Sequence, residues 1–95
     1  MDYKRGEIYF ADLGDMNNNI GNKYSPTVIV ACITSKIYRN EIPTHVKINC
    51  LDQQSLILCE QLKTIDKSRL KNKLANICHQ DEQKVNMALR LSIAL

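Results

Sequence analysis

Apolar residues in the first two thirds of the chain gather in short runs of strand length. Residues 7–13, EIYFADL, are rich in aromatic and β-branched side chains and predict a first strand, entered from a turn at Gly6. Residues 27–33, TVIVACI, form a continuous apolar run, which is typical of a strand buried on both faces. Residues 17–26 lie between these runs and are rich in Asn, Gly, Ser and Pro, so they predict a loop.

The middle of the chain predicts two further strands. Residues 44–48, THVKI, alternate between polar and apolar side chains, as a half-exposed strand does. Residues 55–65, SLILCEQLKTI, begin apolar and then alternate, which predicts one long, bent strand.

The last third of the chain changes to helical patterns. Asp66 is placed to cap a short helix over residues 67–74, with cationic side chains toward its end. Asp81 opens a second helix, whose predicted inner face carries Val85, Ala88, Leu89 and Ser92. Strands first and helices last predict an α+β fold that is mainly β: a small barrel of antiparallel strands with short helices and a C-terminal amphipathic helix.

Composition places the chain among ordinary globular domains. Its 95 residues suffice for one domain, over 1–95, and 44% hydrophobic with 24% charged residues argues against disorder. The net charge of +3 allows an acidic or nucleic-acid partner. The N-terminus is charged and no apolar run approaches the length of a membrane span, so we expect a cytoplasmic protein with no membrane partner.

The four cysteines, at positions 32, 50, 59 and 78, do not suggest a metal site. There is no C-x-x-C pair, and His79 is the one histidine near any of them. A reducing compartment also argues against disulfides. We therefore interpret Cys32 and Cys59 as small buried hydrophobic residues.

No familiar catalytic motif is present, so a catalyst here would act without metal or cofactor. The candidates are polar groups at strand ends. Thr34 directly follows an apolar strand, where its hydroxyl either satisfies a local backbone group or serves an active site. Glu60 and Gln61 interrupt an apolar run, and they are either a solvated pair or include one side chain that is buried or held in a cleft. The candidate cations are Lys4, Arg5, Lys36 and Lys63.

The remaining titratable residues have simpler interpretations. His45 lies in the alternating strand and is interpreted as a packed or surface histidine, and His79 as part of a helix cap. The charge run is interpreted as a solvated helix face, or at most a modest nucleic-acid patch: Lys67, Arg69, Lys71 and Lys73.

Several segments together resemble one family. KRGEIYFADLG, IGNKYSPTVIVACIT, PTHVKI, SLILCEQLKTIDKSRL and the closing amphipathic helix are similar, in this order, to the MazF/PemK toxins of bacterial toxin–antitoxin systems. The resemblance implies an SH3-like barrel, a homodimer and a sequence-specific endoribonuclease that cuts single-stranded mRNA without metal or cofactor. It also implies a MazE-like antitoxin as partner, with operator DNA bound only through the toxin–antitoxin complex.

The resemblance also implies a mechanism and its residues. The substrate's own 2′-hydroxyl attacks the phosphate and leaves a 2′,3′-cyclic phosphate and a 5′-hydroxyl, helped by an Arg at the start of the family's second strand and a Thr at the end of its third. Thr34 matches that Thr and is the predicted catalytic residue. The implied RNA-binding residues are Glu60, Gln61, Lys4, Arg5 and Lys36, with Gln61 placed to read a base edge.

The family's Arg has no counterpart in this chain. It belongs to a G-G-x-R-P motif that opens an apolar strand, whereas here Met16 runs directly into Asn17. About a dozen residues are missing, which fits a loop and a strand. A smaller gap falls near residues 50–51. Arg5 lies too early in the chain and Arg39 too late to match the motif.

Two explanations of the gap are open. In the first, the sequence is that of a longer toxin from which flexible segments have been omitted, and we favour this explanation because a barrel without the strand would expose unpaired edges. In the other, the chain is a true deletion variant. It would then be a catalytically inactive relative that dimerises, binds the antitoxin and helps to repress its operon.

Overall fold

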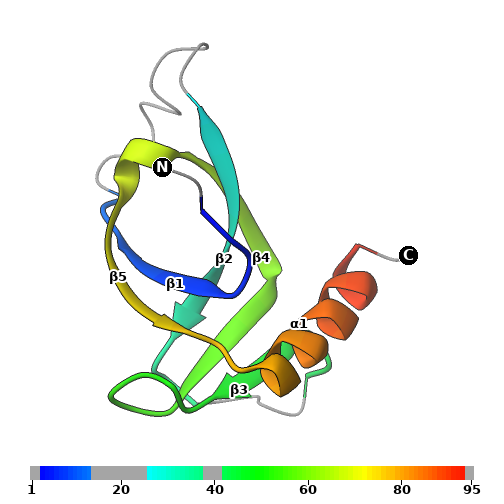
Figure 1. Ribbon diagram of the computed structural model, residues 1–95. Helices are drawn as coiled ribbons and strands as arrows, with labels where there is room; N and C mark the ends of the chain where they lie inside the picture. Colours follow the sequence, from blue (N-terminus) through cyan, green and yellow to red (C-terminus); the bar gives the residue numbers. More distant parts are fainter. Residues whose placement is uncertain (1–2, 14–25, 38–41, 94–95) are drawn as a thin grey trace.

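The computed structural model describes residues 3–13, 26–37 and 42–93 (Figure 1). Its elements follow the order β1, β2, β3, β4, a 3-10 turn η2, β5 and α1. Their bounds are β1 Glu7–Ala11, β2 Thr27–Thr34, β3 His45–Ile48, β4 Ser55–Asp66, η2 Lys67–Arg69, β5 Leu70–Asn76 and α1 His79–Ser92. The loop predicted over residues 17–26 lies, except for Pro26, outside the described residues.

The strands form two antiparallel sheets. β1 pairs with β5, and β4 lies between β2 and β3 in a second, three-stranded sheet. A mainly β, antiparallel fold with a C-terminal helix is therefore confirmed. Over the described ranges, however, backbone pairing does not join the two sheets into one closed barrel.

β4 is one long strand with a bend, as predicted. Ala31 of β2 pairs with Leu62 of β4, but the next residue, Cys32, pairs with Leu58. Residues 59–61 of β4 therefore have no partner on β2, and this bulge accounts for the kink of β4 in Figure 1. Glu60 and Gln61 stand at the bend.

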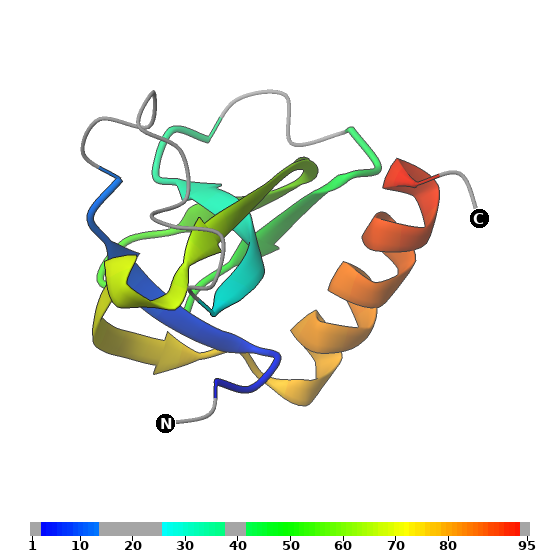
Figure 2. The same ribbon diagram turned by 90° about the horizontal axis from the view of Figure 1, so that it is seen from above.

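The core lies between the inner face of the sheets and α1, which runs along one flank of the molecule (Figure 2). Its buried residues are Ile8, Val46, Ile48, Ile57, Cys59 and Ala88. Val85 and Leu89 pack against them, so Val85, Ala88 and Leu89 of the predicted inner face of the helix are confirmed. The helix begins earlier than predicted: Cys78 is the N-cap, and its sulfur accepts from the backbone N–H of Asp81 in the first turn.

The helix predicted over residues 67–74 is wrong. Only η2 is helical, and the Asp66 side chain makes no capping hydrogen bond. Residues 70–76 form β5, in which Asn76 lies opposite Glu7 of β1. Pairing with β1 outweighs the local helical pattern, because helix and strand propensities are weak against such tertiary contacts. The predicted charged helix face is thus a turn and a strand.

The prediction that residues 27–33 are buried on both faces is also wrong. None of the eight residues of β2 is buried, and Ile29 is 68% exposed. Among the described strands β2 pairs with β4 alone, so it stands at the edge of its sheet. In the described part of the chain, no strand pairs with the outer side of this apolar run, which is why its side chains are not buried.

Both flanks of segment 14–25 are attached to one corner of the fold. After β1, the backbone N–H of Asp12 donates to the carbonyl of Arg69, 2.9 Å away. The Arg69 guanidinium in turn donates to the Asp12 carbonyl at 3.2 Å. Before β2, the carbonyl of Pro26 accepts from the N–H of Lys67 at 3.1 Å. The described residues on either side of segment 14–25 are therefore both held at η2.

The cysteines follow the prediction in part. Cys59 is fully buried, as expected, whereas Cys32 is half-buried. All four are free thiols. Burial raises the pKa of the Cys59 thiol to about 11, so it is unreactive at neutral pH.

Candidate active site

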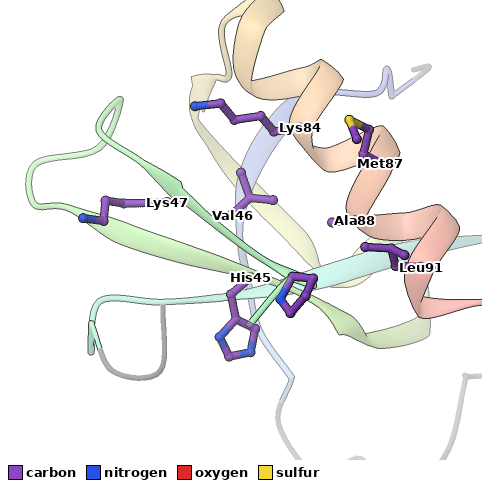
Figure 3. Close-up of a pocket in the computed structure, with 8 residues that line it drawn as sticks. His45, Val46, Lys47, Lys84, Met87, Ala88 and Leu91 are labelled. Carbon is purple, nitrogen blue, oxygen red and sulfur yellow. The ribbon is translucent and has the colours of Figure 1, made fainter. Parts of the chain in front are cut away.

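The pairing register of the strands places the side chains of Thr34, His45 and Lys47 on one face of the three-stranded sheet. Thr34 of β2 and Lys47 of β3 lie on either side of Leu56 of β4. Residues directly opposite in antiparallel strands project to the same face, so Thr34 and Lys47 share a row, roughly 10 Å apart at their Cα atoms. His45 belongs to the next row of that face, and Figure 3 shows it pointing away from Val46, which packs toward α1.

Thr34 is the last residue of β2, and its hydroxyl oxygen accepts one hydrogen bond. The Oγ1 atom accepts from the backbone N–H of Lys36 at 3.1 Å. This is the local backbone bond that the sequence suggested as the simpler role of Thr34. A hydroxyl can accept and donate at once. The bond to Lys36 therefore orients the oxygen and leaves its hydrogen to donate to a substrate oxygen.

Glu60 holds two side chains of the β3 region. Its Oε1 accepts from Thr44 Oγ1 at 2.9 Å, and its Oε2 lies 2.9 Å from His45 Nε2. Burial acts to raise the pKa of Glu60, but the hydrogen bonds from His45, its own backbone and Thr44 outweigh it, so the pKa lies below its usual value. Glu60 and Gln61 are both exposed, so the interpretation that one is buried is wrong.

His45 is a packed histidine, as predicted, with only 6% of its side chain exposed. The Glu60 carboxylate accepts a hydrogen bond from the tautomer that carries hydrogen on Nε2. Sequence reasoning considered each of these residues but not their pairing. The signal was present in principle, since a Glu at the bend of one strand can meet a His on the neighbouring strand.

The other predicted cations are dispersed. Lys36 is exposed two residues after Thr34, next to the candidate site. Lys4 is exposed before β1, where its backbone N–H donates to Glu7. Arg5 is bonded to Asn86 of α1, and the structure therefore does not bring it to Thr34.

No described arginine occupies the rows of Thr34 or His45. Arg5 is held by α1, Arg69 by the carbonyls that follow β1, and Arg90 lies on α1. Lys47 is the cation that the register places in the row of Thr34. In the described ranges, no group of three His, Cys, Asp or Glu side chains could hold a metal ion. Within the same ranges, no helix is long and apolar enough to cross a membrane.

A shallow groove of about 370 Å³ runs between β3 and α1 (Figure 3). Met87 and Leu91 form its apolar helical wall and are largely exposed. Lys47 and Lys84 also line it, which gives the groove a positive rim. His45 lines the groove too, so the groove adjoins the face that carries Thr34.

Comparison with known proteins identifies the family. A model described as PemK-like, MazF-like toxin of type II toxin–antitoxin system matches residues 4–93. The chain belongs to this family. It is 43% identical to the endoribonuclease MazF of Staphylococcus saprophyticus over 97% of its own length and 92% of the relative's. It is 41% identical to the endoribonuclease EndoA of Bacillus subtilis, over 97% of this chain and 95% of EndoA.

Solved structures of two endoribonucleases share the fold. An endoribonuclease in complex with its cognate antitoxin, from a mycobacterial species, superposes with a TM-score of 0.79 over 99% of this chain and 97% of that one, at 20% identity. A second mycobacterial endoribonuclease gives a TM-score of 0.75, over 96% of this chain and 90% of that one, at 21% identity. These likenesses support the architecture described above.

The alignments also show a difference in length. Each spans 110 positions, of which this chain supplies about 92, or 97% of its 95 residues. About 18 positions are therefore filled only in the relatives. This number is compatible with the gaps predicted from the sequence, after Met16 and near residues 50–51, whose positions stay predictions.

Proposed function

We propose that this chain is the toxin of a type II toxin–antitoxin system and acts as a metal-independent, sequence-specific endoribonuclease on single-stranded mRNA in the cytoplasm. The family match over residues 4–93 and two relatives named as endoribonucleases support the activity. The observation that carries it here is the position of Thr34, at the end of β2, with its hydroxyl oxygen oriented by Lys36 and its hydrogen free to donate.

The proposed chemistry uses the RNA as its own nucleophile. The 2′-oxygen bonds to phosphorus, the bond to the 5′-oxygen breaks, and the leaving oxygen takes up a proton. Thr34 donates to a non-bridging phosphate oxygen, where negative charge develops. The ammonium of Lys47, in the same row, adds positive charge near that oxygen. The products are a 2′,3′-cyclic phosphate and a 5′-hydroxyl.

Substrate binding falls to the polar residues around this face. Gln61, exposed at the bend of β4, is placed to read a base edge. Glu60 positions His45 through the 2.9 Å contact. Lys36 contacts a phosphate beside Thr34, and Lys4 and Arg5 contact phosphates farther along the strand.

The chain works with partners in this proposal. It forms a homodimer and is neutralised by a MazE-like antitoxin, and it meets operator DNA only within the toxin–antitoxin complex. The mycobacterial structure with its cognate antitoxin supports the antitoxin as partner. The net charge of +3 suits an acidic, disordered antitoxin segment.

Without the family's arginine, this chain is expected to cleave RNA slowly. Removing one preorganised donor from a transition-state site typically costs about 10²–10³ in rate. We therefore expect this chain to cleave RNA about 100- to 1,000-fold more slowly than EndoA measured beside it. The second candidate function, a catalytically inactive dimer that binds antitoxin and represses the operon, is favoured by the same 18 unfilled positions.

Cleavage of a long single-stranded RNA in EDTA tests the proposal. The wild-type chain should give fragments with cyclic phosphate ends, and Thr34→Ala should lower the rate by at least tenfold. Thr27→Ala is a matched control, because Thr27 is exposed at the opposite end of the same strand. Absence of cleavage at high protein concentration, with retained antitoxin binding, would favour the inactive dimer.

A further inference from the structure

We propose that a pocket beside α1 is a binding site for a phosphate monoester, the doubly charged group carried by a free nucleotide or by the 5′-phosphate end of an RNA. The pocket has a volume of about 320 Å³. Two arginines and three other side chains line it: Arg5, Asn86, Leu89, Arg90 and Ile93.

The two arginines come from distant parts of the sequence and meet at this pocket. Arg5 precedes β1, and its guanidinium donates a hydrogen bond to the side-chain oxygen of Asn86 on α1. Asn86 and Arg90 are four residues apart in the helix, so they lie on the same side of it. The bond to Asn86 therefore holds the Arg5 side chain on the side of α1 that carries Arg90.

Neither guanidinium is neutralised by a carboxylate of the described residues. Within these ranges the two ion pairs of the protein involve neither arginine. Glu82, one turn before Asn86, lies close to Gly6 and does not line the pocket. Both arginines are exposed, and each guanidinium has five N–H donors, of which Asn86 uses one from Arg5. The pocket therefore offers two positive charges and several N–H donors to an anion.

The charge and the walls of the pocket favour a phosphate monoester among anions. At neutral pH this group carries a charge of about −1.5 to −2, which two guanidiniums match. An internal RNA phosphate carries a single charge. Guanidinium groups bind phosphate oxygens through paired N–H donors. Leu89 and Ile93 form the apolar part of the wall, and Ile93 is 52% exposed, so an organic group attached to the phosphate has apolar surface to contact.

The pocket lies on the opposite side of α1 from the groove next to β3. At 3.6 residues per turn, residues 86, 89, 90 and 93 form one side of the helix, whereas residues 84, 87 and 91 form the other. Figure 3 shows Lys84, Met87 and Leu91 on the side that lines the groove. The helix therefore separates this pocket from the groove that adjoins the Thr34 face.

The site goes beyond the proposed function. Arg5 has a part in both, because it contacts an RNA phosphate in the proposed function. Arg90 has no part in the proposed cleavage, so the experiments below use Arg90.

Isothermal titration calorimetry with AMP tests the site. We expect saturable binding of one AMP per chain, with a Kd on the order of 1 mM, because charges at an open site are screened by solvent and salt. Adenosine, which lacks the phosphate, should not bind at the same concentrations. Inorganic phosphate should compete with AMP and bind more weakly, because it has no organic group to contact Leu89 and Ile93.

Paired protein variants locate the site. Arg90→Gln removes one guanidinium and should raise the Kd for AMP at least tenfold. Lys84→Gln is the matched control, because it removes the same charge from an exposed position on the other side of the same helix, and it should bind AMP as the wild type does. Both positions are exposed, so both variants should keep the wild-type Tm without AMP. Ile93→Ser should weaken the binding of AMP but not that of inorganic phosphate.

Backbone amide spectra give a readout that does not depend on variants. AMP should shift the N–H resonances of Asn86 and Arg90. It should leave that of Lys36, which donates to Thr34, unchanged.

A 2′-O-methyl oligonucleotide, which has no free 2′-hydroxyl and so cannot be cleaved, separates the two sources of the phosphate. If the ligand is an RNA end, the 5′-phosphorylated form should bind at least tenfold more tightly than the 5′-hydroxyl form. Arg90→Gln should then abolish the difference. Equal binding of the two forms, with AMP still bound, would assign the site to a free nucleotide.

Three results would overturn the site. The first is the absence of saturable AMP binding at roughly 10 mM, tenfold above the expected Kd. The second is binding of adenosine as tightly as AMP. The third is an equal loss of AMP binding in Arg90→Gln and Lys84→Gln, which would show a general effect of positive charge. None of these results concerns cleavage at Thr34, so failure of this site and failure of the proposed function are distinguishable.

Discussion

Replacement of Ile29 by alanine tests the most unexpected feature of the fold, the exposure of an apolar strand. Burial of a complete Ile side chain contributes about 1.5–3 kcal/mol. Ile29 is 68% exposed, so about a third of that contribution, roughly 0.5–1 kcal/mol, is at stake. No cavity forms at an exposed position. Ile65→Ala is the matched control, because Ile65 lies in the same β2–β4 ladder and is fully buried.

The control should cost about 2–5 kcal/mol, which includes the cavity that the deletion leaves. Alanine also has a lower strand propensity than isoleucine, which costs both variants up to about 1 kcal/mol of stability. This cost is the same in both variants and cancels when they are compared. Urea unfolding followed by circular dichroism measures both free energies of unfolding. We expect the loss to be larger for Ile65→Ala, by about 1–4.5 kcal/mol. Equal, large losses would refute the exposed edge and would show that β2 is covered in solution.

Four further outcomes are expected. Gly6 has a φ of +88°, and an added Cβ would lie 3.0 Å from a Glu82 carboxylate oxygen. Gly6→Ala should therefore lower the free energy of unfolding by about 1–2 kcal/mol, measured by thermal unfolding. An unchanged Tm would contradict this prediction. Folding lowers the pKa of Glu60, so the stability that its carboxylate contributes is complete above its unfolded pKa of about 4.3 and is lost as the pH falls through its folded pKa. Glu60→Gln should therefore flatten the pH dependence of Tm below about pH 4.3. The slope of Tm against pH above about pH 6 should be the same in the variant and the wild type. Cys59, with a pKa of about 11, should resist a thiol reagent at pH 8 until the protein unfolds, while the two exposed cysteines react at once; early labelling of Cys59 would argue against its burial. Lys47→Met should reduce cleavage about tenfold or more without changing Tm, whereas Lys71→Met, on β5, should change neither.

The elements that the sequence predicted correctly are those whose pattern is set locally. β1 was predicted from its aromatic and β-branched residues, β3 and α1 from their periodicity, and the bent strand β4 from an apolar start followed by alternation. The helix predicted over 67–74 failed because β5 forms only by pairing with β1, from which it is some 60 residues distant in sequence. Such pairing leaves no periodic signal in LKNKLAN.

The exposure of β2 could not be predicted for a similar reason. A continuous apolar run indicates a strand with neighbours, and the sequence alone does not show whether those neighbours are present. Within the described residues β2 has a partner strand on one side only, and nothing in its own apolar pattern signals this.

The candidate site was predictable residue by residue but not as an arrangement. Thr34 could be identified from its place at the end of an apolar run and from the family motif. The row that it shares with Lys47, and the contact of Glu60 with His45, depend on the register of three strands. Register is set by turns and core packing and is not visible in any one strand.

The most direct test of the proposed activity is single-turnover cleavage of a long single-stranded RNA, in EDTA, by purified protein of confirmed intact mass. A mass of 10.9 kDa would establish that the cleaving protein is this 95-residue chain. We expect slow cleavage with 2′,3′-cyclic phosphate ends by the wild type, at least tenfold slower cleavage by Thr34→Ala, and no change for Thr27→Ala. Equal cleavage by wild type and Thr34→Ala, or none by either, would contradict the assignment of Thr34 as the catalytic residue of this toxin.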